Sequence, residues 1–434
     1  MIHLLSMLML VVGLTSPPSV CAVVTGSIFG PGSEAFPIAV LPLENLGGDQ
    51  GGRLGSEFAR ILSRDLRLSG YFRLLDPAPF AERTASHGLE AADPDFVAWA
   101  ALGASEVVKG SVLAAGDQIT VEVRMYDVAG RRDVPEVGRR FTGPRTDLAR
   151  MAHRTADRVL EVLTGERGPF DSRIALTSTR NGGLKELFTY TFDQEVPVAV
   201  TNLRGIVVGP RWHPDRRSVL FASYQQHQPR LFQIELASRH VRPLTSQGVF
   251  LSGAWSPDGL QLLVTREVGG NSDIYLYDAG GRELRRLTDH WAIDVSPAWA
   301  PDGRRFAFCS ARTGVPQIYI MDIAGGEARR VSRTGNYNTS PVWSPKGDML
   351  AWVTRGSGGF QVVVQPIDGE PRTITRQGSN EDPSWSPDGR YLVFSSTQNG
   401  RRTLWMADRE GRTQHQLTSG AGGDSSPAWS AWLE

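Results

Sequence analysis

The C-terminal part of the chain repeats one pattern of apolar and polar positions every 42 to 44 residues. A tryptophan is followed by a polar turn, and the turn by an apolar run such as residues 306–310. A second turn leads to a run that alternates apolar and polar residues, such as residues 317–322, and then to a short run ending in Leu-Thr or a similar pair. Several short antiparallel strands in a repeat of this length are typical of a β-propeller blade. The marking tryptophans are Trp212, Trp255, Trp299, Trp343, Trp385 and Trp429.

The turn after each tryptophan has the composition of a tight chain reversal. In the Ser-Pro-Asp-Gly turn at residues 256–259, proline presets φ and aspartate tolerates the following position, while glycine adopts the left-handed conformation that returns the chain. Two turns deviate, with Arg216 in place of the glycine and Lys346 in place of the aspartate. Each substitution should cost about 1 kcal/mol or less if the backbone adjusts.

The two ends of the repeat array predict how it closes. Residues 172–204 contain three strands of a blade without a preceding tryptophan turn, and the array ends in a lone strand at residues 427–430. The last strand should complete the first blade and close a ring of six, which removes exposed strand edges. Because a blade cannot bury both faces alone, we expect the tryptophans to fill the gaps between neighbouring blades.

Residues 36–168 predict a small α/β domain before the propeller, which we place at residues 169–434. Compact or alternating apolar runs predict strands at residues 37–42, 72–75, 106–112 and 119–126. Apolar residues at helical spacing predict helices at residues 55–68, 96–102 and 147–163, the first ended by Gly70. The overall fold class is therefore α/β plus all-β.

The first 22 residues have the pattern of an export signal. Residues 2–14 are mostly apolar but too few to span a bilayer, and Thr-Ser-Pro-Pro-Ser follows them. Val20 and Ala22 are small enough for a signal-peptidase site, so cleavage is expected between Ala22 and Val23. Cys21 also suggests lipid attachment, but the bulky Val20 before it disfavours that alternative. We expect an exported protein with an N-terminal tail at residues 23–35.

The composition excludes several classes of function. The 46 basic residues balance the 46 acidic ones, so no net charge would hold the protein on nucleic acid or on an anionic membrane. Of two cysteines, Cys21 lies in the leader, which leaves neither a disulfide nor a Cys/His metal site. The glycines at residues 47–52 match no nucleotide-binding fingerprint, and no cofactor is expected. We interpret His153 as a structural residue bonded to Asp157, one helical turn further on.

Several motifs together resemble the TolB family of the bacterial Tol–Pal cell-envelope system. They are Pro37-Ile-Ala-Val-Leu-Pro42, Asp65-Leu-Arg-Leu-Ser-Gly70, Leu163-Thr-Gly-Glu-Arg-Gly168 and the Ser-Pro-Ala-Trp-Ser-Pro-Asp-Gly repeats. The propeller repeat alone would be a weak signal, because prolyl-oligopeptidase-like enzymes carry similar blades, and the preceding domain makes the resemblance specific. It implies a monomeric, non-enzymatic periplasmic protein that supports outer-membrane integrity and constriction during cell division.

The resemblance also implies two protein partners. The peptidoglycan-associated lipoprotein Pal should bind at one mouth of the propeller channel, and the C-terminal domain of TolA should bind the N-terminal tail. Other outer-membrane proteins are further candidate partners. The predicted Pal-facing residues lie in the loops that enter each innermost strand, with two exposed aromatic side chains among them. They are Val249, Phe250, Ser252, Asp294, Val295, Ser296, Tyr337, Asn338, Thr339, Asn380, Glu381, Asp382, Asp424 and Ser425.

The predicted TolA-binding segment could add a strand to its partner, although its glycines and Pro31 weaken its strand character. Its residues are Val23, Val24, Thr25, Ser27, Ile28 and Phe29.

Any single polar residue of the Pal-facing loops could equally cap a turn, and we favour a binding role only for the set. Three functions other than Pal binding are also considered. A propeller-gated serine peptidase would need a Gly-x-Ser-x-Gly motif, which the sequence lacks. A lyase or glycosidase in the channel would need clustered histidines or carboxylates, and the histidines are scattered singly. A periplasmic scaffold for a different assembly is the third alternative.

Overall fold

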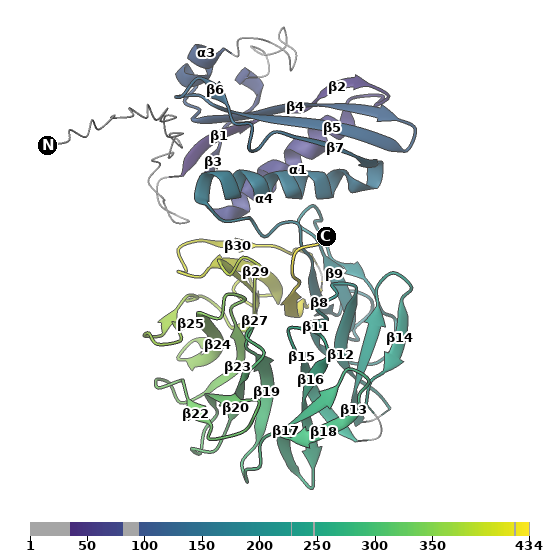
Figure 1. The fold of residues 1–434 in the computed structure, drawn as a ribbon, viewed down its shortest axis with the longest axis vertical. Helices are drawn as coiled ribbons and strands as arrows, with labels where there is room; N and C mark the ends of the chain where they lie inside the picture. The colour runs from purple at the N-terminus through teal and green to yellow at the C-terminus, as the bar shows by residue number, and fades with distance from the viewer. Residues whose placement is uncertain (1–34, 81–94, 227, 246–247, 421, 434) are drawn as a thin grey trace, which may run out of the picture.

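The computed structural model describes residues 35–80, 95–226, 228–245, 248–420 and 422–433 (Figure 1). The predicted leader, its cleavage site between Ala22 and Val23, and the predicted TolA-binding residues lie outside the described residues.

The first domain is a mixed sheet with helices, as the sequence predicts. Strands β1, β3 and β4 pair in parallel, as do β2 and β4, whereas β5 pairs antiparallel with β4, β6 and β7. The strands are β1 (Phe36–Val40), β2 (Glu44–Gly47), β3 (Phe72–Leu74), β4 (Glu106–Ala115), β5 (Gln118–Asp127), β6 (Arg132–Asp133) and β7 (Arg139–Pro144). The helices are α1 (Arg53–Ser69), α3 (Phe96–Ala101), the 3-10 turn η1 (Arg145–Asp147) and α4 (Leu148–Thr164).

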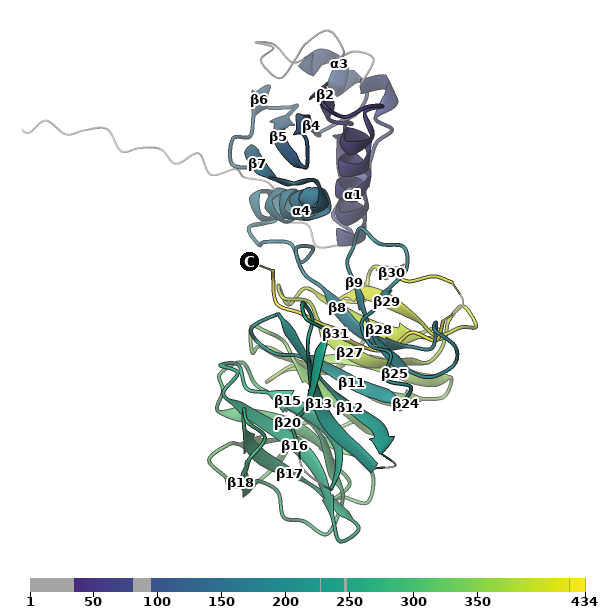
Figure 2. The same ribbon diagram turned by 90° about the vertical axis from the view of Figure 1, so that its right-hand side faces the viewer.

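Helix α4 lies between this sheet and the propeller (Figure 1), whereas α1 runs beside the sheet and points one end at the propeller (Figure 2). Each buries the apolar stripe expected from its spacing, with Phe58, Ile61 and Leu62 on α1 and Val159 and Leu160 on α4. Both helices end at a glycine in the left-handed conformation, Gly70 and Gly165.

The second domain is a ring of six four-stranded antiparallel sheets. The strands of the first three blades are β8 (Ile174–Ser178), β9 (Glu186–Tyr190), β10 (Val198–Ala199) and β31 (Ser425–Trp429); β11 (Val207–Trp212), β12 (Ser218–Gln226), β13 (Gln228–Glu235) and β14 (His240–Pro243); and β15 (Val249–Trp255), β16 (Gln261–Val268), β17 (Asn271–Asp278) and β18 (Glu283–Arg286). Those of the last three are β19 (Asp294–Trp299), β20 (Arg305–Ser310), β21 (Gln317–Asp322) and β22 (Arg329–Arg330); β23 (Asn338–Trp343), β24 (Met349–Gly356), β25 (Gly359–Pro366) and β26 (Arg372–Thr373); and β27 (Asn380–Trp385), β28 (Tyr391–Ser396), β29 (Thr403–Asp408) and β30 (Gln414–Gln416).

The C-terminal strand closes the ring, which confirms the prediction from the array ends. Strand β31 pairs antiparallel with β8, with Trp429 opposite Ile174 and Ala428 opposite Ala175. The first blade therefore combines strands from both ends of the propeller, and its sheet order is β10-β9-β8-β31.

The tryptophans join neighbouring blades, as expected. The Trp299 indole donates a hydrogen bond of 3.0 Å to the carbonyl of Ala254 in the preceding blade. Trp385 donates in the same way to Val342, and Trp212 to Ala428 across the closure. The turns that follow also form as predicted, with Arg216 at a φ of 61°, a left-handed conformation that the other units give to glycine.

The two domains lie against each other (Figure 2), and buried apolar residues of both form one continuous core. The Tyr391 hydroxyl of the sixth blade donates a hydrogen bond of 2.8 Å to the carbonyl of Ser69 at the end of α1. The Arg64 guanidinium of α1 donates to the Tyr190 hydroxyl at 2.9 Å and to the Gln194 carbonyl at 2.8 Å. The propeller is thus held to the helical face of the first domain by hydrogen bonds as well as by apolar packing.

The expected hydrogen bond between His153 and Asp157 does not form. His153 instead contacts Asp65 and Asp193, and the Asp157 carboxylate accepts hydrogen bonds from the backbone N–H groups of Phe170 and Asp171. Helical spacing places His153 and Asp157 on neighbouring turns, but each side chain turns toward a different buried partner outside the helix. The prediction of a structural role was right, whereas the predicted partner was wrong.

Candidate functional site: the two mouths of the propeller channel

The six innermost strands, β11, β15, β19, β23, β27 and β31, surround the central channel (Figure 1). Each ends at its marking tryptophan, so the channel has two chemically different ends. We call the end where these strands begin the strand-start mouth and the end where they finish the tryptophan mouth.

Five residues before the tryptophan, each of four innermost strands carries a buried polar side chain. Asp424 accepts hydrogen bonds from Arg180 at 2.6 Å and Ser178 at 2.7 Å. Asp294 accepts from Arg312 at 2.9 Å, and burial raises the pKa of the Asp294 carboxyl. These carboxylates tie the start of the innermost strand to the end of the next strand of the same blade.

Asn338 and Asn380 occupy the same position in the fifth and sixth blades. They donate hydrogen bonds to Gln317 at 2.9 Å and Gln361 at 3.0 Å, respectively. Phe250 occupies the equivalent position of the third blade and is 2% exposed. The expectation that Phe250 is an exposed aromatic is therefore wrong, because the residue at this position turns between the blades.

The remaining predicted Pal-facing residues are buried or half-buried. Ser425 is buried and hydrogen-bonded to Thr177. Val249, Ser252, Val295, Ser296, Tyr337, Thr339, Glu381 and Asp382 are half-buried.

Three residues before the tryptophan, the backbone adopts the left-handed conformation in five blades, and in four of them the residue is not glycine. Ser296 and Asp382 have φ values of 56° and 55°, and Ser340 and Ser426 are similar. A register shift in the strand pairing accompanies each of these residues, and a proline follows each one. Such bulges re-aim side chains beside functional sites. They give the channel wall small polar groups and one carboxylate, Asp382.

The sequence analysis missed an apolar rim on the strand-start mouth. The rim residues lie in loops before innermost strands or in hairpins that reach the same end of the blades. The side chains of Trp291 and Ile293 are 78% and 51% exposed, so neither belongs to the hydrophobic core. The apolar rim consists of Leu184, Ile206, Tyr224, Val268, Trp291, Ile293 and Val315. A signal was present, since Trp291 is a tryptophan outside the repeat register, but the predicted loop began only at Asp294.

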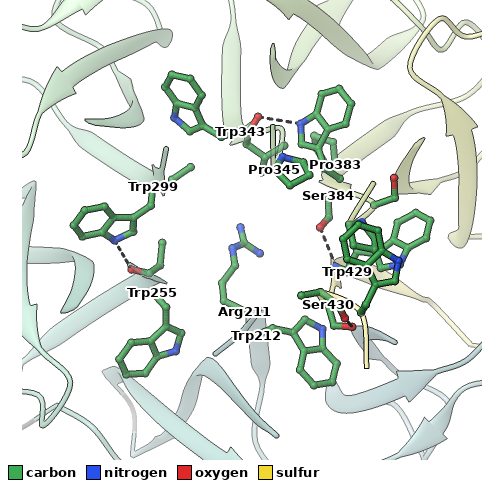
Figure 3. A pocket seen from close by; sticks show the side chains of 18 of the residues that line it. Arg211, Trp212, Trp255, Trp299, Trp343, Pro345, Pro383, Ser384, Trp429 and Ser430 are labelled. Carbon is green, nitrogen blue, oxygen red and sulfur yellow. Dashed lines mark hydrogen bonds between the residues drawn. The ribbon is translucent and has the colours of Figure 1, made fainter. Parts of the chain in front are cut away.

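The tryptophan mouth is a bowl of about 420 Å³ (Figure 3). Indole and proline side chains form most of its wall, and Ser384, Ser430 and Ala431 contribute small residues. Arg211 points from β11 into the open middle of the bowl (Figure 3). Burial lowers the pKa of the Arg211 guanidinium, and the nearby Asp382 carboxylate opposes that shift.

The described part of the chain offers little further reactive chemistry, as its cysteine and its possible metal ligands show. Cys309 is buried and donates a hydrogen bond to the Asn338 carbonyl, and burial raises its pKa to about 11. Among the described residues, no group of three or more His, Cys, Asp or Glu side chains could hold a metal ion. None of the described helices combines the length and apolar character that a membrane span requires.

Comparisons with known proteins agree with this architecture. Residues 25–134 match the model of the TolB amino-terminal domain, and residues 160–433 match that of the TolB beta propeller domain. The second match covers more than half of the chain. The chain belongs to the TolB family.

Two curated relatives and one solved structure illustrate the family. The Tol-Pal system protein TolB of Anaeromyxobacter dehalogenans strain 2CP-C is 37% identical over 274 residues, and that of Desulfosudis oleivorans 34% identical over 265 residues. These matches span 63% and 61% of this chain, and 61% and 60% of the relatives' own lengths. The crystal structure of TolB from Acinetobacter baumannii superposes with a TM-score of 0.81 at 28% identity, covering 93% of this chain and 99% of that one. The expected family and fold, an α/β domain followed by a six-bladed propeller, are confirmed.

Proposed function

We propose that this TolB-family chain is a non-enzymatic, periplasmic binding component of the Tol–Pal system, which captures Pal at the strand-start mouth. Through that contact it would support outer-membrane integrity and constriction during cell division. Membership in the TolB family, whose relatives are Tol-Pal system proteins, supports this role.

The apolar rim is the observation that carries the choice of mouth. A large exposed aromatic beside smaller apolar residues, surrounded by polar groups, has the composition of a protein-binding hot spot. The Trp291 and His290 rings lie in tilted contact with their centroids 5.3 Å apart, and the His290 carbonyl accepts a hydrogen bond from the Asn271 side chain of the third blade. These contacts tie the Trp291 loop to the third blade, so the indole is presented from a supported loop.

The half-buried predicted residues would form the centre of the same contact. In this proposal Ser296, Thr339 and Asp382 would face the channel near the rim and form hydrogen bonds with a segment of Pal that enters it. The buried Asp294, Asn338, Asn380 and Asp424 would contribute indirectly, by fixing the loops. A moderate, partly wet interface follows from this mixture of groups.

Residues 23–34 would bind the C-terminal domain of TolA by adding a strand to its sheet. This part of the proposal rests on the family resemblance, in which the same end of the chain pairs with TolA.

Isothermal titration of the purified protein with Pal from the same organism tests the choice of mouth. Trp291→Ala should weaken binding by about 2 kcal/mol, because truncating a hot-spot tryptophan removes a large apolar contact. Leu260→Ala is the matched control, since Leu260 is 66% exposed but lies in a turn at the tryptophan mouth. Absence of any binding to Pal would reject the proposed partner, and a larger loss in Leu260→Ala than in Trp291→Ala would reject the proposed mouth.

A further inference from the structure

One position of the channel wall distinguishes the second blade from the other five. Directly before the marking tryptophan, β11 carries Arg211, whereas the other five innermost strands carry neutral residues. These residues are Ala254, Ala298, Val342, Ser384 and Ala428. Because their side chains are short, the middle of the ring stays open at this level, and the Arg211 side chain extends into that space (Figure 3).

The Arg211 guanidinium has few partners in the wall. Its Nη1 donates a hydrogen bond of 2.9 Å to the carbonyl of Pro210, its own neighbour in the chain. Across the described ranges of the chain, it forms no salt bridge with a carboxylate. A guanidinium carries five N–H donors and keeps its charge in proteins. The bowl therefore holds a cation with more hydrogen-bonding capacity than the contact with Pro210 uses.

The rest of the bowl is apolar and aromatic. Seven of the eleven tryptophans of the chain line it, together with four prolines. A volume of about 420 Å³ lies within the range typical of ligand pockets, which are mostly apolar with a small number of placed polar groups. Aromatic-lined grooves bind extended, proline-containing peptide segments.

We propose that the bowl at the tryptophan mouth binds a peptide carboxylate, with Arg211 as the anchor for the anion and the tryptophans as the apolar wall. The planar guanidinium matches a carboxylate in two parallel hydrogen bonds, and apolar residues next to that carboxylate pack on the indoles. The carboxylate can belong to an acidic side chain or to a free C-terminus, because both present the same group.

This site is distinct from the apolar rim, although Asp382, whose carboxylate lies near Arg211, belongs to the proposed centre of the Pal contact. Trp291 and the apolar rim lie at the strand-start mouth, whereas Arg211 lies at the level of the tryptophans. Loss of one binding activity therefore leaves the other measurable, and failure of either proposal can be told from failure of the other.

Tryptophan fluorescence of the full chain gives a direct readout, because most of its indoles line the bowl. Three probes separate the sources of the carboxylate: acetyl-Pro-Leu-Glu-amide carries it on a side chain, acetyl-Pro-Leu with a free C-terminus carries it on the backbone, and acetyl-Pro-Leu-Gln-amide carries none. We expect at least one carboxylate probe to bind about tenfold more tightly than the neutral probe, which is the effect of one charge-assisted contact.

Variants at position 211 assign the effect to the guanidinium. Arg211→Ala should lose the preference for carboxylate probes, and its ring should still close because three other innermost strands have alanine at this position. Arg211→Lys should retain part of the preference, since it keeps the charge without the planar fork. Arg282→Ala, which removes an exposed arginine, should bind like the unmodified protein.

Binding of one carboxylate probe alone identifies the source, and binding of both supports the shared chemistry. Equal binding of the neutral probe, an unchanged preference in Arg211→Ala, or binding by none of the probes would overturn the proposal.

Discussion

The imidazole of His153 on α4 lies 2.6 Å from the carboxylate of Asp65 on α1, and its second nitrogen lies 3.3 Å from Asp193 in the propeller. One buried imidazole ring thus connects helices α1 and α4 of the first domain to the propeller. Burial opposes a charge on this ring, but the carboxylates of Asp65 and Asp193 outweigh it and raise the pKa of His153 to about 10.

This cluster predicts how stability depends on pH. The pKa of His153 in the folded protein is above its ordinary value of 6.5, so the stabilisation is complete below about pH 6.5 and is lost as pH rises through about 10. His153→Gln should lower the free energy of unfolding near pH 6 by about 3 kcal/mol, because it leaves buried carboxylates without their cation. Urea unfolding at a series of pH values measures this, with the exposed His240→Gln as control. A deficit in His153→Gln that stays constant above pH 10 would contradict the assignment.

The tryptophan hydrogen bonds between blades predict a second difference in stability. Trp299→Phe removes the donor to the Ala254 carbonyl, whereas the Trp343 indole nitrogen has no partner in the described part of the protein. Both substitutions lose similar apolar volume, so the hydrogen bond should account for the difference between them. We expect Trp299→Phe to be less stable than Trp343→Phe by about 1 kcal/mol in urea unfolding. Equal losses would show that packing alone joins the blades.

Arg390 is a further structural residue of the domain seam. Its guanidinium donates to Asp388 at 2.8 Å, to the Thr164 hydroxyl at 3.0 Å and to the Arg167 carbonyl at 3.0 Å. Arg390→Ala should destabilise the protein by about 3 kcal/mol, because Asp388 stays buried without its partner. It should also speed proteolysis of the segment between α4 and β8, which Arg390 holds in place. The exposed Arg401→Ala is the control, and unchanged cleavage of this segment would contradict the role of Arg390.

Deletion of residues 23–34 separates the two proposed partners. The shortened protein should keep its affinity for Pal, because the strand-start mouth is untouched, and should no longer bind the C-terminal domain of TolA. Pull-down with each purified partner measures both effects. TolA binding at an unchanged level would reject the assignment of the N-terminal tail.

The sequence predicted the elements of the fold closely, because each depends on a short-range pattern. The spacing of Phe58, Ile61 and Leu62 predicts α1, and the unpaired strand at Trp429 predicts closure of the ring with β8. The hydrogen-bond partners of His153 could not be predicted from such short-range patterns. Asp65 and Asp193 lie 88 and 40 residues away and meet His153 only once the domains are packed.

The binding surface was predicted less well than the fold. The sequence located the strand-start loops but not which of their side chains are exposed, so Phe250 was included although it is buried, and Trp291 was left out although it is the most exposed large apolar residue described. The sequence does single out Arg211, because it is the one charged residue among the six that directly precede the marking tryptophans. Its direction into the channel depends on the closed ring.

Hydrogen–deuterium exchange of the protein with and without Pal tests the central claim most directly. The account predicts slower exchange at the strand-start mouth, in residues 203–209, 266–272 and 288–296, and unchanged exchange at the tryptophan mouth. Slower exchange confined to residues 429–433 and the turns after the tryptophans would contradict it.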